Sequence, residues 1–142
     1  MPGSKLRVFL DANVIFSGLH SPLGAPGAIL EHYVNGRITA VISQQVLEEV
    51  VRTVHKKLPK AASLLKTLLT NAPPEIVADP PLEAVKTWAH EFSLAYAAVL
   101  AAAVSSKPDY FVTGDGDFLR NRAIIEKAGL YILTPAEFLT RL

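Results

Sequence analysis

The sequence predicts a single α/β domain over residues 1–142, with a mainly parallel central sheet of four to five strands and helices on both faces. Short apolar runs alternate along the chain with longer segments whose apolar residues recur at helical spacing, which is typical of strands joined by crossover helices. Half of the residues are hydrophobic and only 19% are charged, as expected for a sheet that is buried on both faces or for a subunit interface. A chain of 142 residues has the size of one ordinary domain.

The N-terminal half is predicted to alternate between strands and helices. Residues 6–10 form a compact apolar run that ends at Asp11, which indicates a buried first strand. After a loop containing proline and glycine, apolar spacing predicts a helix over residues 28–34, and the β-branched residues 38–42 predict the next strand. Ser43 is a natural N-cap for a following helix, whose apolar stripe consists of Val46, Leu47, Val50, Val51 and Val54.

The C-terminal half continues the alternation. Residues 94–104 are apolar on all sides, which predicts a buried helix. Thr134 and Glu137 have the spacing of a capping box around Pro135 and predict a terminal helix. The remaining expected elements are helices at 60–69 and 118–128, strands at 110–112 and 131–133, and a proline-rich connector that leads into residues 82–92.

Composition excludes several classes of function. The chain has no cysteine, which excludes disulfide frameworks, thiolate zinc sites and cysteine nucleophiles. A net charge of +1 provides no overall field for a polyanion, so contact with nucleic acid would depend on local clusters of basic residues. The most apolar stretch, residues 94–104, is shorter than the roughly 20 residues of a membrane span, and the N-terminus does not read as a signal peptide. We therefore expect a cytoplasmic protein.

Acidic and amide side chains follow two of the predicted strands. Asp11 ends the first strand with Asn13 two residues later, and Asp115 and Asp117 follow the strand at residues 110–112. Parallel sheets place ligands beyond the carboxyl ends of their strands, so these side chains are expected to form one anionic pocket. Oxygen ligands of this kind suit Mg²⁺ or Mn²⁺, and such an ion could activate water for hydrolysis of a phosphodiester.

Four segments in this order resemble the PIN-domain family: VFLDANVIFSGL, SQQVLEEVV, PDYFVTGDGDFL and LTPAEFLTRL. The sequence is most similar to the small single-domain ribonuclease toxins of prokaryotic toxin-antitoxin pairs. The resemblance covers nearly the whole chain and implies a three-layer sandwich, a Mg²⁺- or Mn²⁺-dependent endoribonuclease and a possible antitoxin partner. A homodimer or higher homo-oligomer is expected from the apolar composition.

The resemblance also implies roles for individual residues. Asp11, Glu49 and Asp115 would be metal ligands and catalytic carboxylates, with Asp117 as an auxiliary catalytic acid and Asn13 as a supporting polar residue. Glu49 is preferred to Glu48 because it precedes an aliphatic residue, as the corresponding acid does in the family. Thr113 is either a turn residue or a group placed to hydrogen-bond a metal-bound water or a ligand.

One position departs from the family pattern. An aspartate is expected at the start of the alanine-rich helix, and alignment on residues 99–103 places Tyr96 there. A phenol is a poor Mg²⁺ ligand at neutral pH. The nearby acids Asp79, Glu83 and Glu91 are alternatives if the local alignment is shifted.

A basic run from Arg52 to Lys66 contains no acidic residue. Arg52, Lys56 and Lys57 are the candidates within it for contact with the RNA backbone. The same residues could equally form a solvated helix face, paired with Glu48 and Glu49.

Two other functions remain open from the sequence. One is a PIN-fold module that binds RNA or protein without cleavage, which Tyr96 favours. The other is a metal-dependent phosphatase of the haloacid-dehalogenase type, which usually has a second aspartate where Asn13 stands.

Overall fold

The structure is a computed structural model that describes residues 5–142. Its centre is a five-stranded sheet in the order β3-β2-β1-β4-β5, and every paired strand runs parallel to its neighbour. The strands are β1 (Leu6–Leu10), β2 (Ile38–Ser43), β3 (Glu75–Val77), β4 (Tyr110–Val112) and β5 (Ile132–Leu133). The predicted parallel sheet is therefore confirmed.

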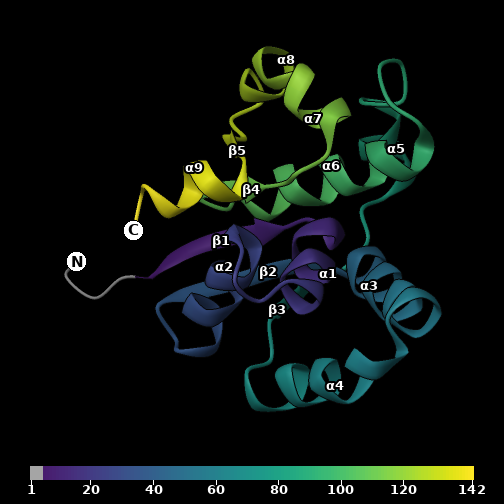
Figure 1. Cartoon of the computed structure of the whole chain (residues 1–142). Coiled ribbons are helices and arrows are strands. Elements are labelled where there is room, and N and C mark those ends of the chain that lie inside the picture. The colour runs from purple at the N-terminus through teal and green to yellow at the C-terminus, as the bar shows by residue number, and fades with distance from the viewer. Residues whose placement is uncertain (1–4) are drawn as a thin grey trace.

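Helices cover both faces of this sheet, as expected where parallel strands are joined by helical crossovers. Helix α1 packs against α2 and α3, α3 packs against α4, and α5 packs against α6. Figure 1 shows α5 to α8 above the strands β1 and β2 and α4 below them. Their bounds are α1 (Ala12–His20), α2 (Ala25–Val34), α3 (Gln44–Lys57), the 3-10 turn η1 (Pro59–Ala61), α4 (Ala62–Asn71), α5 (Leu82–Lys86), α6 (Leu94–Ser106), α7 (Gly116–Arg120), α8 (Arg122–Glu126) and α9 (Pro135–Leu139).

The helix caps read from the sequence are present. The Ser43 hydroxyl accepts a hydrogen bond from Val46 N at 3.2 Å at the start of α3. Thr134 and Glu137 form the reciprocal capping box at the start of α9, with Pro135 in the first turn. Gly129, which follows α8, has a φ of 88°, a conformation that favours glycine.

Four segments of the structure differ from the sequence prediction or make it more exact. Helix α1 was not anticipated, and it begins at Ala12 because Asp11 both ends β1 and caps the helix. Strand β3 lies inside the expected proline-rich connector and pairs with β2 at the sheet edge. The helix expected over residues 118–128 is two helices, α7 and α8, separated at Asn121. Residues 82–92 are helical only over α5.

Aromatic side chains connect the sheet to the helices above it. Phe9 and Phe111 meet edge to face with ring centroids 5.6 Å apart, and Phe111 meets Phe118 of α7 at 5.3 Å. All three are buried, and α6 adds a run of buried alanines to the same core. This packing holds α7 close to the end of β4. Within residues 5–142, no helix is long and apolar enough to cross a membrane.

Candidate functional site

The candidate site begins where β1 and β4 end side by side. Leu10 pairs with Val112 in the register of these strands, and Asp11 N donates a hydrogen bond to Val112 O at 3.1 Å. Asp11 and Thr113 are therefore neighbours at the carboxyl edge of the sheet, although 102 positions separate them in the sequence. The predicted convergence of these two chain segments is a feature of the structure.

Asp11 is a buried carboxylate with three hydrogen-bond donors around it. Only 6% of the residue is exposed. Its Oδ1 accepts from Ala12 N at 2.8 Å, and its Oδ2 accepts from Thr113 Oγ1 at 2.7 Å and from Asn13 Nδ2 at 3.2 Å. A carboxylate has about four lone-pair sites. One site on Oδ1 thus remains free for a further ligand.

Burial raises the pKa of Asp11 to about 6. The hydrogen bonds from Thr113 and Ala12 oppose this shift, whereas the negative charges of Glu49 and Asp115 add to it. The dominant cause is the loss of solvation of the charged form. Glu49 and Asp115 are therefore near enough to Asp11 to act on its ionisation, and a cation among the three would relieve their repulsion.

The loop after β4 is folded onto Asp11 through Thr113. Thr113 is fully buried, and its Oγ1 accepts a hydrogen bond from Asp115 N at 3.0 Å while it donates to Asp11. Asp115 Oδ1 accepts from Asp117 N at 2.8 Å, which caps α7. Gly114 N donates to Asn13 Oδ1 at 3.1 Å. Asn13 and Thr113 thus tie the loop to the end of β1, so Asp11 and the Asp115 backbone are two hydrogen bonds apart.

Glu49 approaches the site from α3. It lines a hollow of about 270 Å³ together with Ala12, Asn13, Phe16, Val50, Thr53 and Lys57. Glu49 is half-buried, whereas Glu48 is exposed and does not line this hollow. Of the two adjacent acids, Glu49 is therefore the one that faces Asn13 and acts electrostatically on Asp11.

Tyr96 lies in the first turn of α6, beside Asp115. Its ring packs on Phe118 with centroids 5.1 Å apart, and its N–H is capped by Ser93 Oγ at 3.3 Å. A hydrogen bond to Asp115, together with partial burial and the charges of Asp115, Asp117 and Asp11, raises the pKa of Tyr96 to about 12. The phenol therefore stays protonated at neutral pH. It contributes a hydrogen-bond donor where the family resemblance leads one to expect a carboxylate.

Asp79, Glu83 and Glu91 were the alternatives for the carboxylate expected at Tyr96, and none of them acts electrostatically on Asp11. Asp79 Oδ1 accepts a hydrogen bond from Gln45 N at 2.9 Å, so it satisfies the N-terminus of α3. Glu83 and Glu91 are exposed, and neither contributes to the pKa shift of Asp11.

Arg120 was not singled out from the sequence. Its guanidinium forms an ion pair with Asp117 at i,i+3 spacing, and both side chains are largely solvent-accessible, at 71% and 50%. The spacing is the one sequence signal that could have indicated it. Asp117 is thus paired with a cation at the rim, whereas Asp11 lies inside.

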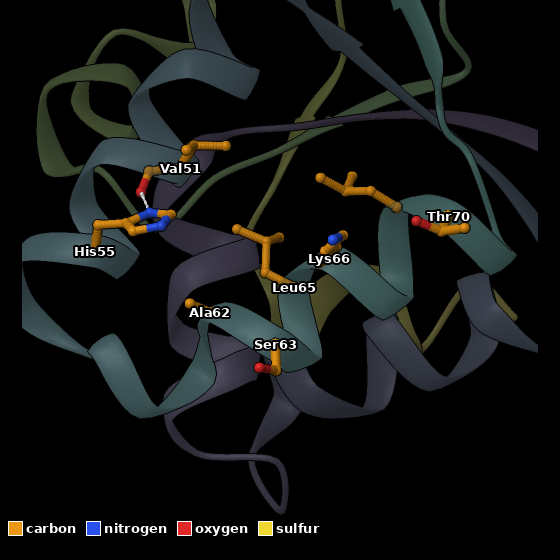
Figure 2. Close-up of a pocket in the computed structure, with 8 residues that line it drawn as sticks. Val51, His55, Ala62, Ser63, Leu65, Lys66 and Thr70 are labelled. Atoms are coloured by element: carbon orange, nitrogen blue, oxygen red, sulfur yellow. Dashed lines mark hydrogen bonds between the residues drawn. The ribbon is translucent and has the colours of Figure 1, made fainter.

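The basic run from Arg52 to Lys66 is divided between two places. Lys57 lines the hollow of about 270 Å³ beside Glu49. His55 and Lys66 instead line a separate, largely apolar groove of about 420 Å³ between α3 and α4, which contains no carboxylate (Figure 2). There His55 Nδ1 lies 2.8 Å from Val51 O, as the dashed line in Figure 2 marks. Arg52 and Lys56 are exposed on α3 and line neither of these two hollows.

The donor set suits a hard cation, although the side chains do not form a closed ligand cage. Asp11, Glu49 and Asp115 offer carboxylate oxygens from β1, α3 and the loop after β4. Among the residues described, no three His, Asp or Glu side chains lie close enough together to hold a metal ion as they stand. Three carboxylates near enough to act on one another's ionisation can nevertheless serve a Mg²⁺ ion that keeps waters or takes phosphate oxygens.

Comparison with known proteins identifies the fold. The family model described as the PIN domain matches residues 7–117. VapBC2 from Rickettsia felis, solved bound to a DNA fragment from its promoter, is 18% identical with a TM-score of 0.67, covering 91% of this chain and 98% of that one. PAE2754 from Pyrobaculum aerophilum is 19% identical with a TM-score of 0.67, over 96% and 94% of the two chains.

FitAcB from Neisseria gonorrhoeae is 21% identical with a TM-score of 0.62, over 91% of this chain and 98% of that one. No curated protein sequence matches the chain. At these identities the structural similarity establishes the fold, and the chemistry depends on the residues of the site.

Proposed function

The chain belongs to the PIN-domain family, and on that premise we propose that it is a Mg²⁺- or Mn²⁺-dependent endoribonuclease that hydrolyses RNA phosphodiester bonds. Asp11, Glu49 and Asp115 would hold the metal and form the catalytic centre, with Asp117 as an auxiliary acid. The observation that carries the proposal is the shared Thr113 hydroxyl, which joins the buried Asp11 carboxylate to the loop bearing Asp115, while Glu49 is near enough to act on the ionisation of Asp11.

The electrostatics of Asp11 support a cation at this place. A carboxylate whose pKa is raised by burial and by two neighbouring acids is costly to ionise, and a divalent cation would compensate for that cost. A bound Mg²⁺ or Mn²⁺ would polarise the phosphoryl oxygen and lower the pKa of a bound water.

The residues of the chain would keep this centre organised. Thr113 and the Ala12 N–H orient the Asp11 carboxylate and leave one lone pair of Oδ1 free. Asn13 restrains the loop after β4 through Gly114 N. Both of its amide groups are thereby engaged, so Asn13 is a supporting residue and not a second acid of the kind that a haloacid-dehalogenase phosphatase uses.

Toxicity and an antitoxin partner are part of the proposal. The sequence resembles the toxins of toxin-antitoxin pairs, and the fold is similar to that of VapBC2, which was solved bound to a DNA fragment from its promoter. By that likeness the chain would be the cytoplasmic toxin of such a pair. Large apolar side chains exposed on separate elements, including Leu64 and Leu94, are consistent with a homodimer or higher homo-oligomer. Light scattering of the purified chain would measure this directly.

The test of the nuclease is manganese-dependent cleavage of single-stranded RNA. The expected result is cleavage by the wild type, its loss in Asp11→Asn and its loss in Glu49→Gln. Glu48→Gln is a matched control, because Glu48 is the exposed neighbour on the same helix and should keep activity. If Glu48→Gln loses as much RNA cleavage activity as Glu49→Gln, the assignment of Glu49 to the site is contradicted. Hydrolysis of small phosphate esters without RNA cleavage would favour a phosphatase.

A second candidate function is a PIN-fold module that binds RNA or protein without cleaving RNA. Tyr96 favours it, since a neutral phenol hydrogen-bonded to Asp115 takes the place of a fourth carboxylate. Under this alternative the wild type would neither bind Mn²⁺ in calorimetry nor cleave RNA. The nuclease proposal requires both.

A further inference from the structure

An acidic centre can act on a polyanion only if cations nearby offset its repulsion of phosphate. Two cationic side chains reach the rim of this site from different elements. Lys57 comes from the last turn of α3 and lines the hollow beside Asn13 and Glu49. Arg120 ends α7 and contacts Asp117.

The two cations belong to helices that follow the strands on opposite sides of β1. Helix α3 follows β2 and helix α7 follows the loop after β4, and β2 and β4 are the two neighbours of β1 in the sheet. Asp11 stands at the end of β1, between them. Lys57 lines the hollow beside Asn13, which hydrogen-bonds Asp11 from one side, and Arg120 pairs with Asp117 of the loop that Thr113 ties to Asp11 from the other side.

Arg120 is held close to the backbone of the acidic loop. A Cβ atom built at Gly116 would lie 2.8 Å from Arg120 Nη1, so the guanidinium lies against the backbone of the acidic loop. Gly116 lies between Asp115 and Asp117. The guanidinium thus occupies the rim of the site itself, while 71% of its side chain stays open to solvent.

The partner of Arg120 can be exchanged at little cost. An exposed ion pair between an arginine and an aspartate contributes about 0–1 kcal/mol to stability. A phosphate group can accept two parallel hydrogen bonds from a guanidinium, and such charge-assisted pairs are among the stronger hydrogen bonds in proteins. A phosphate that arrives at the rim would therefore compete well with Asp117 for Arg120.

We propose that the RNA backbone crosses the carboxyl edge of the sheet from Lys57 to Arg120, each of which contacts a phosphate on one side of the scissile bond. Asp117 competes with the phosphate for Arg120. This inference rests on the proposed function and assigns the substrate path at the same site. Arg120 is a substrate-binding residue in this arrangement, and Asp117 limits its affinity for RNA.

The experiment measures binding of a short, fluorescently labelled single-stranded RNA by anisotropy, in the Asp11→Asn background so that the probe is not cleaved. Arg120→Gln and Lys57→Gln are each expected to weaken binding roughly tenfold. Each should also reduce the slope of log affinity against log salt by about 0.7, the value for one contact with a single-stranded phosphate. Lys66→Gln is the matched control, because Lys66 lines the apolar groove between α3 and α4. It should change neither quantity.

Asp117→Asn distinguishes a competitor of Arg120 from a general negative charge. This variant is expected to strengthen RNA binding several-fold when Arg120 is present and to have no effect when combined with Arg120→Gln. A gain of the same size in both backgrounds would reflect the charge alone and would overturn the role of Asp117. An effect of Arg120→Gln no larger than that of Lys66→Gln would overturn the path while leaving the nuclease proposal standing. Absence of RNA binding in every variant would overturn both.

Discussion

The hydroxyl of Thr113 donates a hydrogen bond of 2.7 Å to the carboxylate of Asp11, and both residues are buried. The same oxygen accepts from Asp115 N at 3.0 Å. One side-chain atom therefore sets the position of the acid at the end of β1 relative to the loop after β4.

Thr113→Val keeps the shape of this side chain and removes its hydroxyl. We expect the free energy of unfolding in urea to fall by about 1–3 kcal/mol, because a buried carboxylate and a backbone N–H each lose a partner. The pKa of Asp11 should rise further, since the Thr113 hydrogen bond lowers it in the wild type. Thr113→Ser, which keeps the hydroxyl, is the control for the pKa. Wild-type stability and an unchanged Asp11 pKa in the valine variant would contradict this role.

Ionisation of Asp11 should make stability depend on pH. The ordinary pKa of this group is 3.8, and burial raises it to about 6 in the folded chain. Because the folded value lies above the unfolded one, the contribution of Asp11 to stability is fully present below pH 3.8 and is lost as pH rises through about 6. In metal-free buffer, the unfolding free energy of the wild type relative to Asp11→Asn should decline by about 3 kcal/mol over this interval.

Divalent metal should reverse that decline. Adding Mn²⁺ at neutral pH is expected to stabilise the wild type and leave Asp11→Asn nearly unchanged, because only the ionised carboxylate binds the cation well. Thermal unfolding of both variants, with and without Mn²⁺, measures the difference. If the unfolding free energies of the wild type and Asp11→Asn change in parallel with pH in metal-free buffer, the raised pKa of Asp11 is contradicted.

Substitutions at Tyr96 test whether the phenol occupies a ligand position. Tyr96→Asp is expected to tighten Mn²⁺ binding on the order of tenfold, about 1.4 kcal/mol, by adding a carboxylate beside Asp115. Nuclease activity should rise with it. Tyr96→Phe retains the ring that packs on Phe118 and serves as the control, with Mn²⁺ affinity near that of the wild type. Calorimetry that finds equal affinity in the aspartate variant and the wild type would place Tyr96 outside the ligand sphere.

Gly27 tests the close packing of α2 on the loop that precedes it. A Cβ atom at this position would lie 2.0 Å from Pro22 O, a backbone atom that cannot rotate away. Gly27→Ala should therefore lower the free energy of unfolding by about 1–3 kcal/mol or more. At Gly24 the nearest atom is Ser21 O at 3.6 Å, so Gly24→Ala is a matched control, expected to change stability by less than about 0.5 kcal/mol. Equal urea midpoints for the two variants would show that the loop yields to the added methyl group.

Local interactions explain which parts of the fold were predictable. Ser43 caps α3, and Thr134 and Glu137 cap α9, through hydrogen bonds that span three residues, so sequence spacing is sufficient to predict them. The unbroken apolar character of α6 likewise predicts its burial. The short edge strand β3 was not predicted, because its hydrogen bonds are made to β2, more than thirty residues away.

The sequence by itself determined a parallel α/β sheet and placed Asp11 and Asp115 just beyond the ends of two strands, because apolar periodicity and strand ends are local properties of the chain. Only the tertiary structure decided that Glu49 and not Glu48 faces Asn13, that Lys57 lines the hollow beside Glu49, and that Tyr96 meets Asp115. These relationships depend on how each helix is rotated against the sheet. The raised pKa of Asp11 also depends on the tertiary structure, because its main cause is burial by residues from distant parts of the chain.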